Sequence, residues 1–149
     1  MRQARDVTAD SSASDAEVRV LDVRAPFRHS AGRLGSEFLQ ALRERRLLGL
    51  RAGDQVIVPP RDFGARGEWV VIGPGARLEA YAPADWVDGG GSCLALVTVD
   101  GADTALLARL RPAAPAGALA KGTRLTLRFA DEPRGSMTDF WFEPAEAGA

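Results

Sequence analysis

A Ser-His or Cys-His catalytic site needs a histidine, and a Cys-His site also needs a cysteine. His29 is the single histidine and Cys93 is the single cysteine. A lone histidine in a polar stretch is usually a surface or packing residue, so we do not expect His29 to be catalytic. Cys93 shares an apolar alternation with Ala95, Val97 and Val99, which predicts a thiol buried in the core rather than a reactive one.

Carboxylates and glycines show no clearer catalytic pattern. The acidic residues gather at turn-like positions, where solvated carboxylates are expected. These pairs are Asp85 and Asp88, Asp100 and Asp103, and Asp131 and Glu132. The glycine-rich pieces GPG and DGGGS lack the Lys-Ser or Lys-Thr that ends a phosphate-binding loop. The residues by themselves therefore indicate a binding or scaffolding domain rather than an enzyme.

Residues 50–69, LRAGDQVIVPPRDFGARGEW, have the layout of a metal-binding ribbon without its ligands. Two turn-like clusters, LRAG and GARG, flank a short apolar run and a Pro-Pro pair. In a zinc ribbon each cluster would carry a Cys-x-x-Cys pair, because thiolates are the ligands that hold structural zinc. Neither cluster contains a cysteine.

The composition is that of an ordinary globular protein, with 46% hydrophobic and 26% charged residues. The net charge is −1, so the basic excess typical of a nucleic-acid-binding surface is missing. A single cysteine excludes an internal disulfide. No apolar run approaches the ~18 residues that span a bilayer, and the first residues lack the apolar stretch of a signal peptide. We therefore expect a cytoplasmic protein that contacts neither nucleic acid nor membrane.

The N-terminal part of the chain is polar. Residues 1–16 lack periodicity, which predicts a disordered tail. Residues 17–49 are predicted to form an arm and a helix. Ser36 precedes EFLQALRERRLLGL, whose apolar residues recur near helical spacing. This pattern predicts an amphipathic helix over residues 36–47 with Gly49 as its stop. Its apolar stripe could dock on its own domain or on a partner.

Residues 69–146 have the pattern of a β domain. EWVVIGPGARLEAYAP predicts one bent strand or two, because its glycines permit a bulge. SCLALVTVD and TALLARLRP predict a hairpin across the turn at residues 100–103. TRLTLRFAD alternates strictly between polar and apolar residues, and DFWFEP predicts a short last strand. About five strands favour a mainly β fold, a five-stranded OB-type barrel.

The aromatic residues allow a second interpretation of such a barrel. They could stack the bases of single-stranded nucleic acid, although in small barrels such residues more often fill the core. The candidates are Trp69, Tyr81, Trp86, Phe140, Trp141 and Phe142. The sequence pI of about 5.9 argues against this function. A stand-alone binder of single-stranded nucleic acid remains the alternative hypothesis.

Four stretches in a fixed order carry a resemblance to a known family. They are PFRHSAGRLGSEFLQALRERRLLGLR, VIVPPRDF, EWVVIGPGARLEAY and the terminal FWFEP. Between Pro26 and Pro144 the chain resembles the acyl-CoA-associated OB-fold family called domain of unknown function 35. Members of that family have an N-terminal helical segment and a rubredoxin-like zinc ribbon before the barrel.

The resemblance also implies where the zinc ligands would fall. Four cysteines of the family pattern correspond to Leu50, Gly53, Gly64 and Gly67. Leucine and glycine have no side-chain ligand, so we predict that this chain holds no zinc. Residues 50–68 would then be a degenerate ribbon, expected to persist as a loop.

Members of the family look like companions of thiolase-fold enzymes, including thiolases, ketoacyl-synthase-like enzymes and steroid side-chain aldolases. The resemblance implies a non-catalytic accessory subunit in a hetero-oligomer, stabilising such an enzyme and bordering its acyl-CoA entrance. The residues expected to face the partner or the acyl-CoA are Pro59, Pro60, Arg61, Phe63 and Arg66. Prolines would stiffen that loop, arginines suit anionic groups and Phe63 would be an aromatic anchor. A third possibility is an acyl-CoA hydrolase or transferase in its own right.

Overall fold

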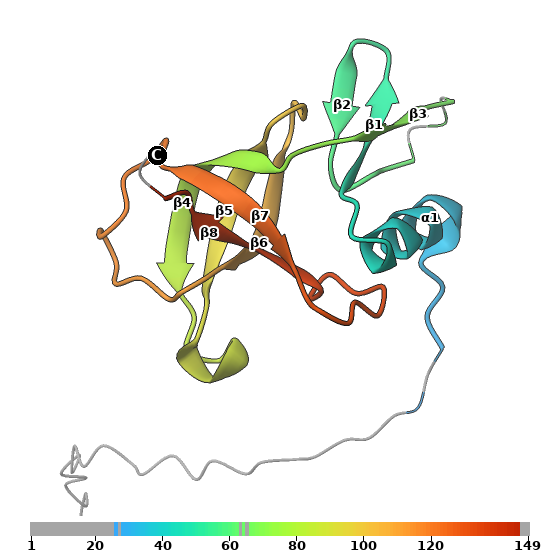
Figure 1. The fold of residues 1–149 in the computed structure, drawn as a ribbon. Coiled ribbons are helices and arrows are strands. Elements are labelled where there is room, and N and C mark those ends of the chain that lie inside the picture. Colours follow the sequence, from blue (N-terminus) through green and yellow to red (C-terminus); the bar gives the residue numbers. More distant parts are fainter. Residues whose placement is uncertain (1–25, 27, 63, 65, 147–149) are drawn as a thin grey trace, which may run out of the picture.

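A computed structural model describes residues 26, 28–62, 64 and 66–146 of the chain. The predicted tail at residues 1–16, most of the arm, and Phe63 lie outside the described residues. Among the described residues, no helix is long and apolar enough to cross a membrane. Figure 1 shows a barrel beside a smaller sheet, with one helix packed near that sheet.

Five strands form a closed barrel in the order β4-β5-β6-β8-β7. The strands are β4 (Gly75–Pro83), β5 (Cys93–Val99), β6 (Ala105–Leu110), β7 (Arg124–Phe129) and β8 (Phe140–Pro144). The pairing of β6 with β8, through Leu110 and Phe142, is parallel, whereas the neighbouring pairs are antiparallel. This connectivity is that of an OB barrel, so the predicted five-stranded architecture is confirmed.

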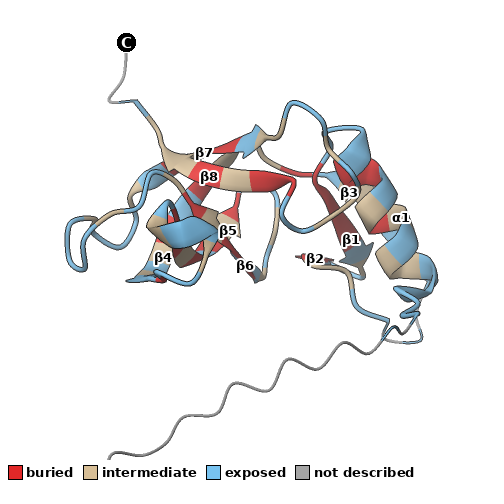
Figure 2. Ribbon diagram, turned by 90° about the horizontal axis from the view of Figure 1, so that it is seen from below, coloured by how far each residue is buried: buried red, intermediate tan, exposed pale blue. Residues whose placement is uncertain are grey.

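The barrel interior is filled by the residues that alternate inward along each strand. Phe140 and Phe142 are fully buried and meet edge to face, with ring centroids 6.2 Å apart. Cys93 is also fully buried, and its sulfur lies 3.3 Å from the carbonyl oxygen of Ala114. The predicted core thiol is therefore confirmed. The same core continues into the smaller sheet and the helix, as the buried residues in Figure 2 show.

Residues 50–68 contain strands where the sequence suggested a loop. The sheet has the order β2-β1-β3, built from β1 (Leu48–Ala52), β2 (Gln55–Ile57) and β3 (Glu68–Val71). The hairpin between β1 and β2 turns at Gly53, whose φ of 65° suits glycine. Leu50 pairs with Trp69, so β3 belongs to this sheet and the barrel strands begin at Gly75. EWVVIGPGARLEAYAP is thus two strands.

The helix α1 (Gly32–Arg43) begins four residues before the predicted start. The N-cap residue is Ala31 rather than Ser36, and no side chain caps the N-terminus of the helix. The apolar stripe that buries Phe38 and Leu42 extends back by one turn to the half-buried Leu34, which explains the earlier start. The two glycines of this turn masked the pattern in the sequence.

The helix also ends before the predicted stop. Arg45 adopts a left-handed φ of 56°, and its N–H donates to the Leu42 carbonyl at 3.0 Å. The N–H of Arg46 donates to the Ala41 carbonyl at 2.9 Å, which completes a Schellman ending. Gly49 is not a stop but a buried residue of β1, where an added Cβ would lie 2.5 Å from Val56.

The small sheet is tied to the barrel through the turn between β5 and β6. The carboxylate of Asp103 accepts from the Val56 N–H at 2.7 Å, and its own N–H donates to the Val56 carbonyl at 2.8 Å. The hydroxyl of Thr104 accepts from the Val58 N–H at 2.8 Å and donates to the Val58 carbonyl at 2.9 Å. The outer edge of β2 is therefore occupied by the barrel hairpin.

Candidate functional site

The loop from residue 58 to residue 67 joins β2 to β3 and carries the residues predicted to face a partner. Pro59 and Pro60 are half-buried, whereas Arg61 and Arg66 are exposed. Neither arginine forms an ion pair with another described residue. Both guanidinium groups are thus accessible at the surface, and Phe63 lies outside the described residues.

The same loop lies against the first turn of α1. Pro60 and Asp62 line a cavity of about 230 Å³ together with residues 31–35. Asp62 also accepts a hydrogen bond from the Gly64 N–H at 2.8 Å, which shapes the loop locally. The structure thus brings the predicted loop and the start of the helix into one surface, although the sequence offered no signal for this juxtaposition.

The four positions that would hold zinc do not fit that metal. Leu50 is buried in β1, Gly53 and Gly64 lie in turns with positive φ, and Gly67 precedes β3. None has a side chain that can donate to a metal ion. Within the part of the chain that the structure describes, no three His, Cys, Asp or Glu side chains group together as a metal site would require.

The Leu50 side chain packs against Gly67, which stands at another of the four expected ligand positions. A Cβ added at Gly67 would lie 2.7 Å from the Cγ and Cδ1 atoms of Leu50 and 3.0 Å from the carbonyl oxygen of Arg51. Leu50 is only 4% exposed. At two of the four expected ligand positions, the buried Leu50 side chain therefore fills the space beside Gly67.

A second cluster lies at the end of the barrel and was not predicted from the sequence. Asp88 accepts hydrogen bonds from Ser92 at 2.8 Å, from Arg109 at 2.6 Å and from Arg111 at 3.2 Å. The Ser92 hydroxyl, followed by the Arg109 guanidinium, holds the pKa of Asp88 below its ordinary value. Arg111 also lies 5.0 Å over the ring of Trp141.

Several turn carboxylates are therefore not merely solvated, which corrects the prediction for Asp88, Asp100 and Asp103. Asp100 accepts two hydrogen bonds from Arg124, at 3.1 and 2.7 Å. Each of the three acids joins segments that are far apart in the sequence, and spacing alone does not reveal such partners.

The barrel-end cluster holds two loops together. Arg109 donates to Asp88 in the β4–β5 loop and also to the carbonyl of Thr138 in the β7–β8 loop. In the second loop Asp139 is 6% exposed and accepts three backbone N–H groups, those of residues 134–136, at 2.6 to 2.9 Å. Burial alone would raise the pKa of Asp139, but these hydrogen bonds outweigh it and the pKa is lowered.

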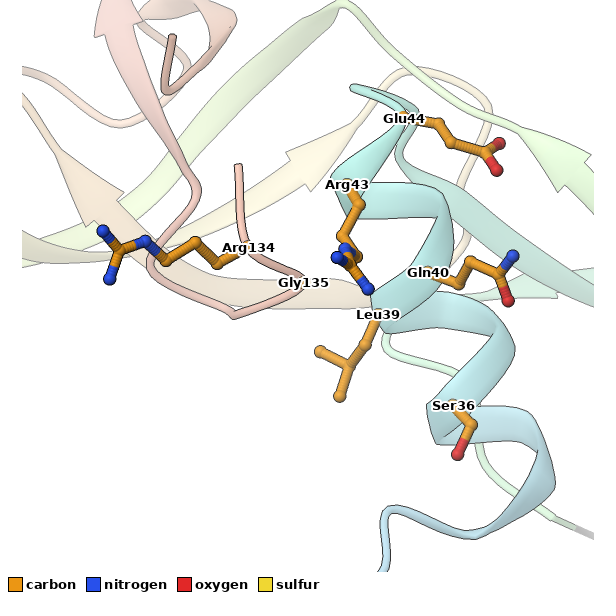
Figure 3. Close-up of a pocket in the computed structure, with 7 residues that line it drawn as sticks. All are labelled: Ser36, Leu39, Gln40, Arg43, Glu44, Arg134 and Gly135. Atoms are coloured by element: carbon orange, nitrogen blue, oxygen red, sulfur yellow. The ribbon is translucent and has the colours of Figure 1, made fainter. Parts of the chain in front are cut away.

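A pocket of about 500 Å³ lies between α1 and the β7–β8 loop. Figure 3 shows its lining, with Arg43 and Leu39 from the helix and Arg134 and Gly135 from the loop. The Arg134 side chain points away from the helix in Figure 3, so the two arginines do not converge on one anion. The pocket does not have the arrangement of a built phosphate site.

Two exposed leucines are neighbours on the outer face of the barrel. Leu96 on β5 pairs with Leu107 on β6, and they are 39% and 59% exposed. Trp86 in the β4–β5 loop is 80% exposed and Met137 in the β7–β8 loop 41%. The sequence held a signal for this face, because β5 and β6 carry leucines at positions that point outward as well as inward.

Neither the collection of family models nor that of curated proteins contains a match to this chain. Two solved structures are similar in fold. A chain of the Ltp2-ChsH2(DUF35) aldolase matches with a TM-score of 0.61 and 21% identity, covering 79% of this chain and 99% of that chain. A protein of unknown function of the DUF35 family from Sulfolobus solfataricus matches with a TM-score of 0.53 and 17% identity. That match covers 76% of this chain and 86% of the other.

These matches establish that the chain has the fold seen in the solved DUF35 proteins. The alignment includes nearly all of the aldolase chain, so its extent exceeds that of the barrel alone. The fold expected from the sequence resemblance is confirmed. The shared fold comprises the helix, the small sheet and the OB barrel.

Proposed function

We propose that the chain belongs to the DUF35 family and is a non-catalytic accessory subunit of a thiolase-fold enzyme that acts on acyl-CoA. The observation that carries this proposal is the match over 99% of a chain from the Ltp2-ChsH2(DUF35) aldolase. The site residues support it, because Cys93 is buried in the barrel and His29 is exposed in a different segment. The catalytic groups would come from the partner.

The loop at residues 58–67 is the part of the chain that we assign to the acyl-CoA entrance. Arg61 and Arg66 are exposed, without an ion-pair partner among the described residues, and suit phosphate or carboxylate groups. Thr104 anchors the start of this loop to the barrel, so the arginines extend from a fixed base. We expect this activity in the cytoplasm.

The proposal is tested by purifying the tagged chain from its native host and identifying co-purified proteins by mass spectrometry. We expect a thiolase-fold protein near one-to-one stoichiometry. A chain that purifies as a monomer without any thiolase-fold protein would contradict the proposal. Association with single-stranded oligonucleotide, weakening steeply with salt, would instead favour the nucleic-acid alternative.

A further inference from the structure

The outer edge of β3 has no described strand beside it. The barrel hairpin occupies the edge at β2, but β3 pairs only with β1. The Ile72 N–H donates to the Leu47 carbonyl at 3.0 Å, which makes these two residues a hydrogen-bonded pair. By the alternation of an antiparallel ladder, the N–H and C=O groups of Trp69 and Val71 then point away from β1. Among the described residues these groups have no hydrogen-bond partner, so the edge can accept another strand.

A groove of about 290 Å³ lies between α1 and this edge. Its apolar lining includes Ala41 of α1, and Trp69 and Val71 of β3. Val71 is 62% exposed and also lines a second hollow, of about 210 Å³, with Leu127 and Phe129 of β7. The edge thus offers free backbone groups together with apolar side chains, which is the combination that an added strand uses.

The helix α1 runs in the same direction as β3, as Figure 1 shows. Glu37, in the first half of α1, accepts a hydrogen bond from the Trp69 indole. The chain that leaves α1 enters β1 at Leu48, which lies opposite Val71. A segment that precedes α1 must therefore turn back at residues 26–31 to lie beside β3, and its direction is then antiparallel to β3.

The chain before α1 has the length and the sequence for such a strand. Residues 1–25 lie outside the described residues, and within them residues 18–24 read VRVLDVR, with β-branched side chains at Val18, Val20 and Val23. Seven extended residues span about 23 Å, which exceeds the length of the four-residue β3. Pro26 follows soon after, and proline is found at the ends of strands because it cannot donate to the ladder.

Two features favour this segment over a strand from another protein. In the antiparallel direction Arg24 comes to the Glu68 end of β3, where exposed Glu68 forms no ion pair with another described residue. The short connection at residues 25–31 also holds the segment near the groove, at an effective concentration on the order of millimolar.

We propose that residues 18–24 bind along the outer edge of β3 as a fourth strand of the small sheet, antiparallel to β3 and within the same chain. The outward N–H and C=O groups of Trp69 and Val71 then have backbone partners. The valines of the segment pack into the groove beside α1. This pairing goes beyond the proposed function, because it needs no thiolase-fold subunit.

The test is amide hydrogen exchange of the pure full-length chain, measured for each residue by NMR. One variant carries Val20→Pro and Leu21→Pro together. Adjacent N–H groups of a strand point to opposite edges, so one of these two faces β3 in any register. We expect the Val71 amide to exchange at least tenfold faster in this variant than in wild type. The Val70 amide points toward β1 and should keep its rate, which checks that the sheet is folded.

The matched control carries Ser11→Pro and Ser12→Pro, outside the proposed strand, and should leave the Val71 rate unchanged. A wild-type Val71 amide that exchanges as fast as an unprotected peptide would overturn the proposal. Protection of Val71 that persists in the Val20 and Leu21 variant would do the same. Protection that is lost when the protein is diluted would show that the strand comes from a second copy, which also contradicts the proposal.

Discussion

The Leu50 side chain fills the space that a side chain at position 67 would need. Leu50→Ala removes a buried side chain and is expected to lower the free energy of unfolding by about 2–4 kcal/mol. Gly67→Ala forces a Cβ against Leu50 and is expected to cost about 1–3 kcal/mol. The double variant should cost less than the sum, because the smaller residue at 50 admits the new methyl group.

Urea unfolding of the two single variants and the double variant measures this coupling. Gly91→Ala is the control, because its Cβ would meet only the carbonyl oxygen of Asp88 at an ordinary 3.5 Å. Strict additivity of the Leu50 and Gly67 effects would show that the packing between them does not matter.

The same pair of residues bears on zinc. We expect purified protein to contain no stoichiometric zinc by elemental analysis, and a chelator to leave its melting temperature unchanged. Since Leu50, Gly53, Gly64 and Gly67 supply no ligand, we expect no metal at these positions for a chelator to extract. One zinc ion per chain would mean that a different set of residues binds it.

Asp139 gives the fold a dependence on pH. Its lowered pKa means that the charged form is favoured in the folded state, so its contribution to stability is present above the ordinary Asp pKa of about 3.9. This contribution is lost as the pH falls through the lower pKa of the folded state. Asp139→Asn should therefore weaken the protein at pH 7 and flatten the loss of stability as the pH falls below about 3.9.

Denaturant unfolding at several pH values measures this difference. A variant that keeps the full acid dependence of the wild type would show that another carboxylate is responsible. Asp54→Asn is a suitable control, because Asp54 is an exposed residue of the β1–β2 turn.

At the scale of elements, the hairpin between β5 and β6 connects the barrel to the small sheet. Thr104→Val keeps the side-chain shape but removes a hydroxyl that accepts from and donates to the backbone of Val58. We expect a loss of about 1–3 kcal/mol, since a partly buried N–H and C=O lose their partner. The amides of Val56 and Val58 should exchange faster with deuterium.

Thr126→Val is the matched control for this element. Thr126 lies half-buried on β7, and its hydroxyl makes no hydrogen bond to another described residue. Equal exchange rates at Val58 in the Thr104 variant and in wild type would show that the link between the units does not hold β2 in place.

Elements with a strong period were predictable, and elements that depend on partners were not. The barrel strands follow from alternation, as in TRLTLRFAD, where Leu125 and Leu127 are buried. The small sheet was missed because β2 has only three residues, and its outer edge is completed by Asp103 and Thr104 from a distant turn. Local propensity does not encode a partner 46 residues away.

At the scale of the whole molecule, the scarcity of His and Cys in the sequence led to the hypothesis of a binding role. That hypothesis stays a prediction. The sequence held the outward leucines of β5 and β6, but only the register shows that Leu107 lies beside Leu96. The prediction for the molecule is that co-expression with the proposed thiolase-fold partner raises its soluble yield several-fold.

Soluble yield with and without the partner, compared on the same gel, measures this effect. The expected physical reason is that a bound partner would remove exposed apolar side chains, of the kind that Trp86 presents, from water. Equal yields in the two cases would show that the isolated chain needs no cover.

The packing of Leu50 against Gly67 has a consequence for the conditions under which the protein can work. Zinc ribbons depend on thiolates, which peroxide oxidises and which then release their metal. Here the corresponding junction is hydrocarbon, and the single cysteine, Cys93, is sealed inside the barrel. The fold therefore has no exposed sulfur ligand to lose, and it should keep its shape under oxidative stress that dismantles a cysteine-based ribbon.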